Sequence, residues 1–288
     1  ANPFVDISFE KEDLINYKQR LDKIYNLIEE IIEEKENNKD TRLDSWLESM
    51  WQTRLKSITE NMEVIEFKNA TDEIYFNFYN DISWYRNRGG NNKEILISVL
   101  KEWILTMGLF TPHLSEELNE KISVKELVSV SSFPKINFKK INTEIIEDEK
   151  RIEKMVGDIR NIIKMSGVEK PNKVTLFISA ESNYLLFKEL KEEIEIKQNR
   201  NVKELMHYFL DKYKDNKELV NKTITSAIKN PAMLSVPENQ NKEFTMYVFA
   251  RDFFSKTLEC NVEIIKAESS GHPKAKTALP GKVGILVE

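Results

Sequence analysis

One stretch of the sequence, D-I-S-W-Y-R-N-R-G-G at residues 81–90, has residue types suited to binding phosphate. Two aromatic residues and two arginines precede a double glycine: Trp84, Tyr85, Arg86 and Arg88. The chain otherwise uses lysine for positive charge, with 34 lysines to 9 arginines. Arginine offers a planar fork of donors that suits phosphate and stacks on rings. The glycines permit a left-handed helix end and a close approach of another backbone. The stretch predicts either a phosphate-binding turn or an ordinary helix end with solvated arginines.

A second basic segment is the run S-S-G-H-P-K-A-K-T-A-L-P-G-K at residues 269–282. It contains three lysines and no acid, and glycine and proline interrupt it. It lies between two predicted strands, so we expect an exposed basic loop.

Other groups with reactive side chains have a spacing that argues against a site. His113, Glu116 and Glu117 share one helical face, but no third independent ligand is nearby, so we expect no metal site. Cys260 starts a predicted strand, far in sequence from the nearest histidines, which favours a structural thiol. The run K-M-S-G at 164–167 indicates a helix end. The sequence therefore predicts no catalytic centre and no cofactor in this chain.

Composition narrows the class of protein. The 288 residues are 40% hydrophobic, enough for one large or two ordinary domains, and no apolar run is long enough to span a membrane. A single cysteine favours an intracellular, cytoplasmic setting. The net charge of the chain is −5, and residues 1–40 alone have a net charge of −5, so residues 41–288 are neutral in total. The acidic total is therefore compatible with a nucleic-acid partner that binds a local basic surface.

Apolar periodicity predicts mostly helix. Before residue 142 we expect four amphipathic helices, at about 9–36, 40–63, 70–88 and 92–109, forming an antiparallel bundle, and a further helical run at 111–118. The four tryptophans all lie between residues 46 and 103, and a loop follows at 131–134, which predicts a domain boundary near residue 142. Afterwards we expect a small α/β domain with helices at 144–166, 181–196, 202–213, 216–230 and 242–258 and strands at 173–179, 262–267 and 282–287.

Several of these segments, taken in order, are similar to leucyl-tRNA synthetases of the archaeal and eukaryotic cytosolic type. They are A-N-P-F-V-D-I-S-F at 1–9, the stretch at 81–90, the helix around Trp103, L-F-T-P-H-L-S-E-E-L at 109–118, S-F-P at 132–134 and A-L-P-G-K-V-G-I-L-V-E at 278–288. The element at 111–118 also resembles valyl, isoleucyl and methionyl enzymes, whereas W-Y-R-x-R-G-G and A-L-P-G-K are more specific. The resemblance covers the whole chain.

The resemblance implies a mainly α fold: an anticodon-binding helical bundle at 1–142, then a small mixed α/β domain at 143–288. The chain would be the carboxy-terminal, tRNA-binding portion of a monomeric ligase whose catalytic core, with ATP and Mg²⁺, and editing domain lie elsewhere. Its partners would be leucine tRNA and that core, with no DNA and no membrane. Arginines and lysines would contact phosphate or sugar, and main chain near 279–281 would meet bases of the long variable arm. The implied tRNA-binding residues are Trp84, Tyr85, Arg86, Arg88, Lys274, Lys276, Leu279, Pro280, Gly281 and Lys282.

Two alternatives remain. One is the equivalent fragment of a valyl or isoleucyl enzyme. The other is a helical scaffold that binds another protein through its acidic first helix at 9–36.

Overall fold

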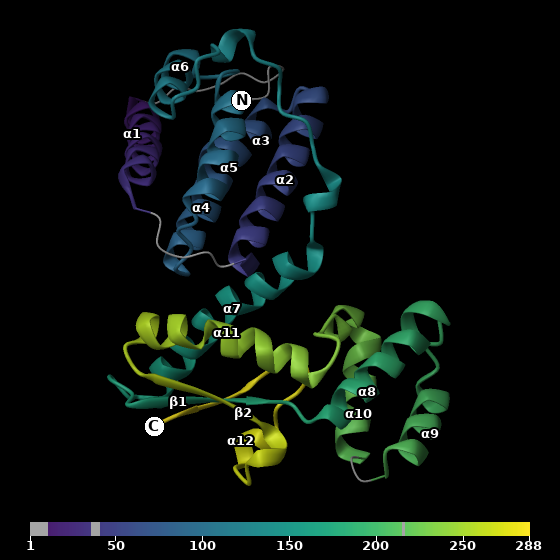
Figure 1. The fold of residues 1–288 in the computed structure, drawn as a ribbon. Coiled ribbons are helices and arrows are strands. Elements are labelled where there is room, and N and C mark those ends of the chain that lie inside the picture. Colours follow the sequence, from purple (N-terminus) through teal and green to yellow (C-terminus); the bar gives the residue numbers. More distant parts are fainter. Residues whose placement is uncertain (1–10, 36–40, 215–216) are drawn as a thin grey trace. The chain divides into compact units, whose positions relative to one another are not determined.

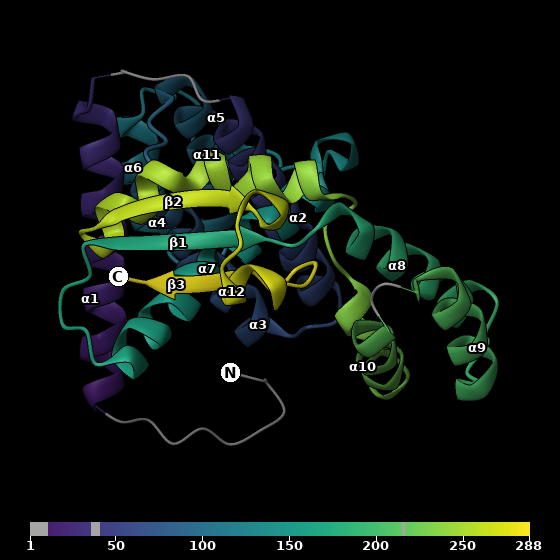
Figure 2. The same cartoon turned by 90° about the horizontal axis from the view of Figure 1, so that it is seen from below.

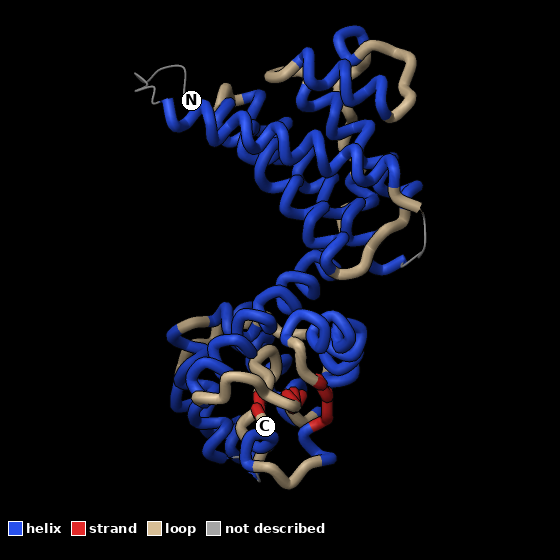
Figure 3. The backbone as a smooth tube through the Cα atoms, turned by 90° about the vertical axis from the view of Figure 1, so that its left-hand side faces the viewer, coloured by secondary structure: helices blue, strands red, loops and turns tan. Residues whose placement is uncertain are grey.

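The computed structural model describes residues 11–35, 41–214 and 217–288 (Figure 1). The chain divides into two compact units, Ala1–Lys150 and Arg151–Glu288. The expected fold class is confirmed, because the described residues are mostly helical and a small mixed sheet lies near the carboxyl end (Figure 3).

The helix α7 (Thr143–Ser166) belongs to both units. The boundary expected between residues 142 and 143 lies just before this helix, whereas the division into units falls within it. The opening turns of α7 belong to the first unit because their acidic side chains pair with arginines of the bundle, as described below.

The first unit is a bundle of amphipathic helices. Figure 1 shows the longer ones side by side, with the chain reversing direction from one to the next. The described helices are α1 (Lys11–Glu33), α2 (Thr41–Glu63), α3 (Phe67–Asp72), α4 (Phe78–Asn87), α5 (Lys93–Met107) and α6 (Pro112–Lys121). The expected helix at 70–88 starts earlier, at Phe67, and a π-helical turn, η1 (Glu73–Asn77), interrupts it. Two short 3₁₀ turns follow α6, at Val128–Val130 and Phe138–Lys140.

Three aromatic rings form the centre of this bundle. Phe78 contacts Trp51 at a centroid distance of 4.6 Å and Trp103 at 5.2 Å, and all three side chains are fully buried. The Trp103 indole N–H donates to the Ile74 carbonyl at 2.8 Å. Since Ile74 lies in the π turn, where the helical bonding is shifted by one residue, the interruption provides an acceptor for a buried donor.

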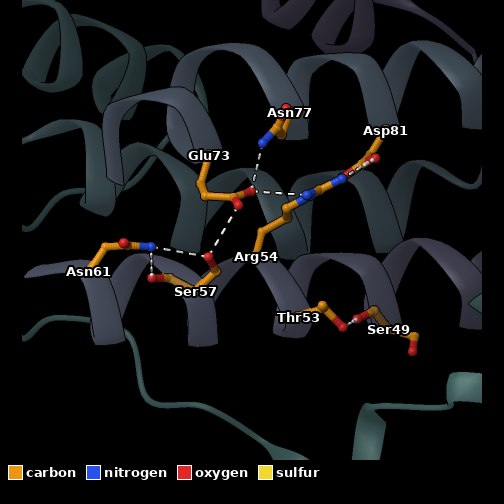
Figure 4. A network of polar contacts seen from close by, with 8 residues as sticks. All are labelled: Ser49, Thr53, Arg54, Ser57, Asn61, Glu73, Asn77 and Asp81. Atoms are coloured by element: carbon orange, nitrogen blue, oxygen red, sulfur yellow. Dashed lines mark hydrogen bonds and ion pairs between the residues drawn. The ribbon is translucent and has the colours of Figure 1, made fainter. Parts of the chain in front are cut away.

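A polar network ties α2 to η1 and α4 (Figure 4). Arg54 donates to both oxygens of Asp81, at 2.8 and 3.2 Å, and to Glu73 at 2.9 Å. Ser57 and Asn77 also donate to Glu73, at 3.1 and 3.0 Å. One guanidinium therefore pairs with two carboxylates where the stretch at 81–90 begins.

The second unit contains a three-stranded sheet in the order β2-β1-β3. Its strands are β1 (Lys173–Ile178), β2 (Asn261–Lys266) and β3 (Gly284–Val287). β1 pairs in parallel with β2 and antiparallel with β3, so Val174 lies opposite both Val262 and Val287. The three strands match those expected from β-branched runs.

Helices cover this sheet and form a separate apolar cluster beside it (Figures 1 and 2). α11 (Gln240–Leu258) packs on β2 and β1, and the short α12 (Pro273–Lys276) packs on β1 and β3. The cluster beside them consists of α8 (Glu181–Lys191), the π turn η4 (Glu192–Ile196), α9 (Val202–Lys212), α10 (Lys217–Lys229) and the 3₁₀ turn η6 (Pro231–Leu234).

We expect Arg54→Ala to lower the free energy of unfolding by about 3–5 kcal/mol, because the Asp81 and Glu73 carboxylates both lose the guanidinium that pairs with them. Urea unfolding followed by circular dichroism measures the change. Arg251→Ala is the matched control, since Arg251 pairs with Asp252 at the surface with 55% and 90% of the side chains exposed, and such pairs contribute little. Equal losses in the two variants would contradict a structural role for the Arg54 network.

Candidate nucleic-acid interface

Tyr85 lies completely buried near the end of α4. Its hydroxyl donates to Asp44 at 2.6 Å and accepts from the Asn92 N–H at 3.0 Å. The Asn92 amide donates to the other Asp44 oxygen at 2.7 Å. Tyr85 therefore joins α2, α4 and the start of α5. A ring with no exposed surface cannot stack on a base, so the expected contact of Tyr85 with RNA does not fit the structure.

The double glycine ends α4 as a Schellman motif. The Gly90 N–H donates to the Tyr85 carbonyl and the Gly89 N–H to the Arg86 carbonyl, each at 2.9 Å. Gly89 has a φ of +97°, as a left-handed helix end requires. A Cβ atom on Gly90 would lie 2.4 Å from the Tyr85 ring. The close neighbour of Gly90 is thus a tyrosine ring, not a second backbone as expected.

Arg88 also points into the first unit. Only 1% of its side chain is exposed, and its Nε donates to Glu149 on α7 at 2.9 Å. Burial raises the pKa of the Glu149 carboxyl, and the Arg88 guanidinium opposes that rise. A second pair links Arg42 to Asp148 at 2.7 Å. Arg88 thus holds α7 against the bundle, and its burial does not fit the expected direct contact with phosphate.

Arg86 lies at the surface, in a cleft of about 650 Å³ between α1, α4 and the turn at 89–91. Its guanidinium donates to Glu30 at 2.8 Å and to Glu34 at 3.2 Å, and 25% of its side chain is exposed. Trp84 is half-buried. Of the two arginines, only Arg86 can reach RNA, and it must exchange two carboxylates for phosphate to do so.

The basic segment of the second unit is not the fully exposed loop expected, because it contains the short helix α12 and buries Ala275 and Ala278 against Phe177. Its lysine side chains stay open to solvent. Lys274, Lys276 and Lys282 are exposed, the first two on α12 and the third at the end of a tight turn. In that turn Leu279 and Lys282 exchange backbone hydrogen bonds of 3.0 and 2.8 Å. Pro280 is buried at its tip, and Gly281 has a φ of +69°, which is typical of a type II turn.

The main-chain donors of this turn are already in use. The N–H groups of Leu279 and Lys282 bond across the turn, and that of Gly281 donates to Glu243 at 3.2 Å. Proline has no N–H. These N–H groups are therefore not available to bases, so the expected main-chain contacts near 279–281 would have to use carbonyl groups. The lysine side chains remain exposed to solvent.

Two clefts flank the turn, and Leu279 lines both. One, of about 290 Å³, contains Lys282 together with Arg151 and Lys154 of α7. The other, of about 370 Å³, contains Lys276 together with lysines of α10. The α10 lysines, Lys217 and Lys222, had no distinguishing signal in the sequence, because only the fold brings them beside residues 276–279.

The other reactive side chains have structural surroundings. The Glu116 carboxylate accepts from the N–H groups of Val128 and Ser129, at 2.9 and 3.0 Å, and these bonds lower its pKa. Burial raises the pKa of the Cys260 thiol. Within the described ranges, no group of three His, Cys, Asp or Glu side chains could hold a metal ion. None of the described helices is long and apolar enough to cross a membrane.

Residues 44–176 match the anticodon-binding domain of tRNA ligases. The chain is also similar, over nearly all of its length, to leucine–tRNA ligases. It is 30% identical to that of Methanocaldococcus jannaschii and 26% identical to that of Pyrococcus abyssi, in each case over 98% of the chain and 29% of the ligase. The chain thus spans less than a third of the length of these relatives.

These matches define the chain first as one that carries an anticodon-binding domain of the tRNA ligase type. More particularly, it is homologous to part of the leucine–tRNA ligases, which confirms the resemblance expected from the sequence.

We expect Arg88→Met to lower the free energy of unfolding by about 3–5 kcal/mol, because Glu149 then lies buried without its counter-charge. Arg88→Met combined with Glu149→Met should recover most of that loss, since apolar side chains can replace a buried ion pair. Urea unfolding of the two variants and the unaltered chain measures the difference. If the folded double variant bound tRNA much more weakly than the unaltered chain, Arg88 would have a role in RNA contact that its burial does not suggest.

Proposed function

We propose that this chain is the tRNA-binding portion of a leucine–tRNA ligase. It holds leucine tRNA for a catalytic core in the remainder of a longer, monomeric, cytoplasmic enzyme, and that core uses ATP and Mg²⁺. The bundle lies along the inner side of the tRNA, and the unit at 151–288 contacts the long variable arm. This fragment alone is inactive as a ligase.

The observation that carries the proposal is the distribution of charge between the units. Residues 151–288 contain 23 basic and 19 acidic side chains, a net charge of +4, whereas residues 1–150 contain 20 basic and 29 acidic ones, a net charge of −9. Phosphate contacts supply much of the affinity of proteins for nucleic acids. The second unit, with its exposed lysines around the turn at 279–282, is therefore the stronger candidate for the main RNA contact.

The test is to measure binding of this chain, at two salt concentrations, to a leucine tRNA transcript and to the same transcript with its variable arm cut to a short loop. We expect affinity to fall about 10- to 100-fold on shortening, because one or two contacts of roughly 1–2 kcal/mol disappear. Equal binding to both transcripts would contradict the assignment of the second unit to the arm and would favour another synthetase.

Replacing the three exposed lysines, Lys274→Gln, Lys276→Gln and Lys282→Gln, should weaken binding to the long-armed transcript. It should also reduce the slope of log affinity against log salt by roughly 2, since each phosphate contact contributes about 0.7–0.9. Lys164→Gln, Lys188→Gln and Lys256→Gln form the matched control, because these exposed lysines line neither cleft beside the turn. Equal effects of both sets would indicate an unspecific response to net charge.

Within the stretch at 81–90, Arg86 is the arginine through which we expect the bundle to contact RNA. We expect Glu30→Gln with Glu34→Gln to raise tRNA affinity about 2- to 10-fold, because the guanidinium no longer has to leave two carboxylates. In the Arg86→Ala background the same two changes should give a smaller gain. Fluorescence titration with tRNA measures all four combinations. A gain of the same size with and without Arg86 would show that only the local negative charge matters and that Arg86 does not contact RNA.

A further inference from the structure

The cleft of about 370 Å³ in the second unit joins elements that are far apart in the sequence. One wall is the first half of α10, with Lys217, Leu219 and Lys222. The other consists of Lys276 and Leu279, at the end of α12 and the start of the tight turn. Cations thus lie on both sides of the same open cleft.

Among the residues that the structure describes, the lysines of this cleft form no ion pair. Elsewhere in the same unit Lys212 pairs with Glu189 at 2.7 Å and Lys197 with Glu193 at 2.8 Å. The cleft lysines make no such pair with any described residue, and one acid, Glu218, lines the cleft beside three lysines. A pocket with this excess of positive charge attracts an anion.

The helix α10 holds Lys217 and Lys222 in a fixed relation. Its other face is buried, with Val220, Ile224 and Ala227 in the apolar cluster. Lys217 and Lys222 are both exposed, and they lie five residues, or roughly 7.5 Å along the axis, apart. Lys217 begins the helix, where the helix dipole adds partial positive charge.

The cleft suits a chain of phosphates better than a single ion. Its cations are exposed lysines rather than buried donors closing on one anion, and lysine acts as a hydrated point charge. Leu279 also lines the neighbouring cleft, where Arg151, Lys154 and Lys282 outnumber one acid, Asp158. Cationic side chains therefore continue from α10 across the turn at 279–282 to α7.

We propose that α10 is an RNA-binding element, in which Lys217 and Lys222 together with Lys276 hold consecutive backbone phosphates of the RNA strand that crosses the turn at 279–282. This inference rests on the proposed function, because it takes tRNA as the ligand. Contacts of this kind set the position of the strand without reading its bases.

The test compares the unaltered chain with Lys217→Gln plus Lys222→Gln in binding to the long-armed leucine tRNA transcript over a series of salt concentrations. We expect affinity to fall about 10-fold and the salt slope to decrease by roughly 1.5, because two phosphate contacts are lost. The matched control is Lys203→Gln plus Lys229→Gln, two exposed lysines of α9 and α10 outside the cleft, which should change neither quantity appreciably. Circular dichroism confirms that each variant is folded.

Three other outcomes are distinguishable. If the α10 variant binds as tightly and with the same slope as the unaltered chain while the variant at 274, 276 and 282 is weakened, α10 is not an RNA-binding element and the proposed function stands. If the unaltered chain binds no tRNA, the proposed function fails and this inference fails with it. If inorganic phosphate displaces tRNA more strongly than chloride at equal ionic strength, and does so only when the α10 lysines are present, the cleft is a site for a single anion and the inference is wrong.

Discussion

A pair of opposite charges with almost no exposed surface, Arg88 and Glu149, fixes the end of α4 against the opening turns of α7. Removing two ions from water is costly, and their attraction offsets that cost only when the pair is well oriented. Either ion buried alone would be strongly destabilising. The Schellman motif at Gly89 and Gly90 provides that geometry by ending α4 at Asn87, with Arg88 as the C-cap residue. Tyr85, packed over Gly90, closes the same region. The stretch at 81–90 is therefore first of all an architectural element.

The electrostatics of the two units follow from this arrangement. In the bundle each arginine at the end of α4 is paired with glutamate, so positive charge is neutralised where it occurs. In the unit at 151–288 lysines gather around the turn at 279–282 and stay exposed. Since exposed cations can release counter-ions on meeting phosphate, whereas paired ones must first lose a carboxylate, the second unit has the larger capacity to bind RNA.

Periodicity predicted the longer helices and the three strands because it depends on local sequence and burial, but it assigned the segment of α12 to a loop. It missed the π turn at Glu73–Asn77, in which the Ile74 carbonyl accepts a hydrogen bond from the Trp103 indole N–H on another helix. Composition singled out Arg86 and Arg88 correctly as unusual, but their different surroundings depend on Glu30 and Glu149, which are distant in sequence. The lysines of α10 were missed for the same reason, because they join residues 276–279 only in the folded chain. Sequence thus predicts which residues are unusual, and long-range packing decides what they contact.

The kinds of cation present also limit how this chain can select a tRNA. Bidentate recognition of a base edge is characteristic of arginine, whereas lysine is a mobile point charge that any phosphate satisfies. The clefts beside the turn at 279–282 contain five lysines and one arginine, Arg151, which also donates to the Ser235 carbonyl at 3.4 Å. The main-chain N–H groups of the turn are bonded internally. If the chain binds tRNA as proposed, selection by this surface would depend mainly on the shape of the RNA, since an RNA that places a strand along both clefts can meet all of these cations together.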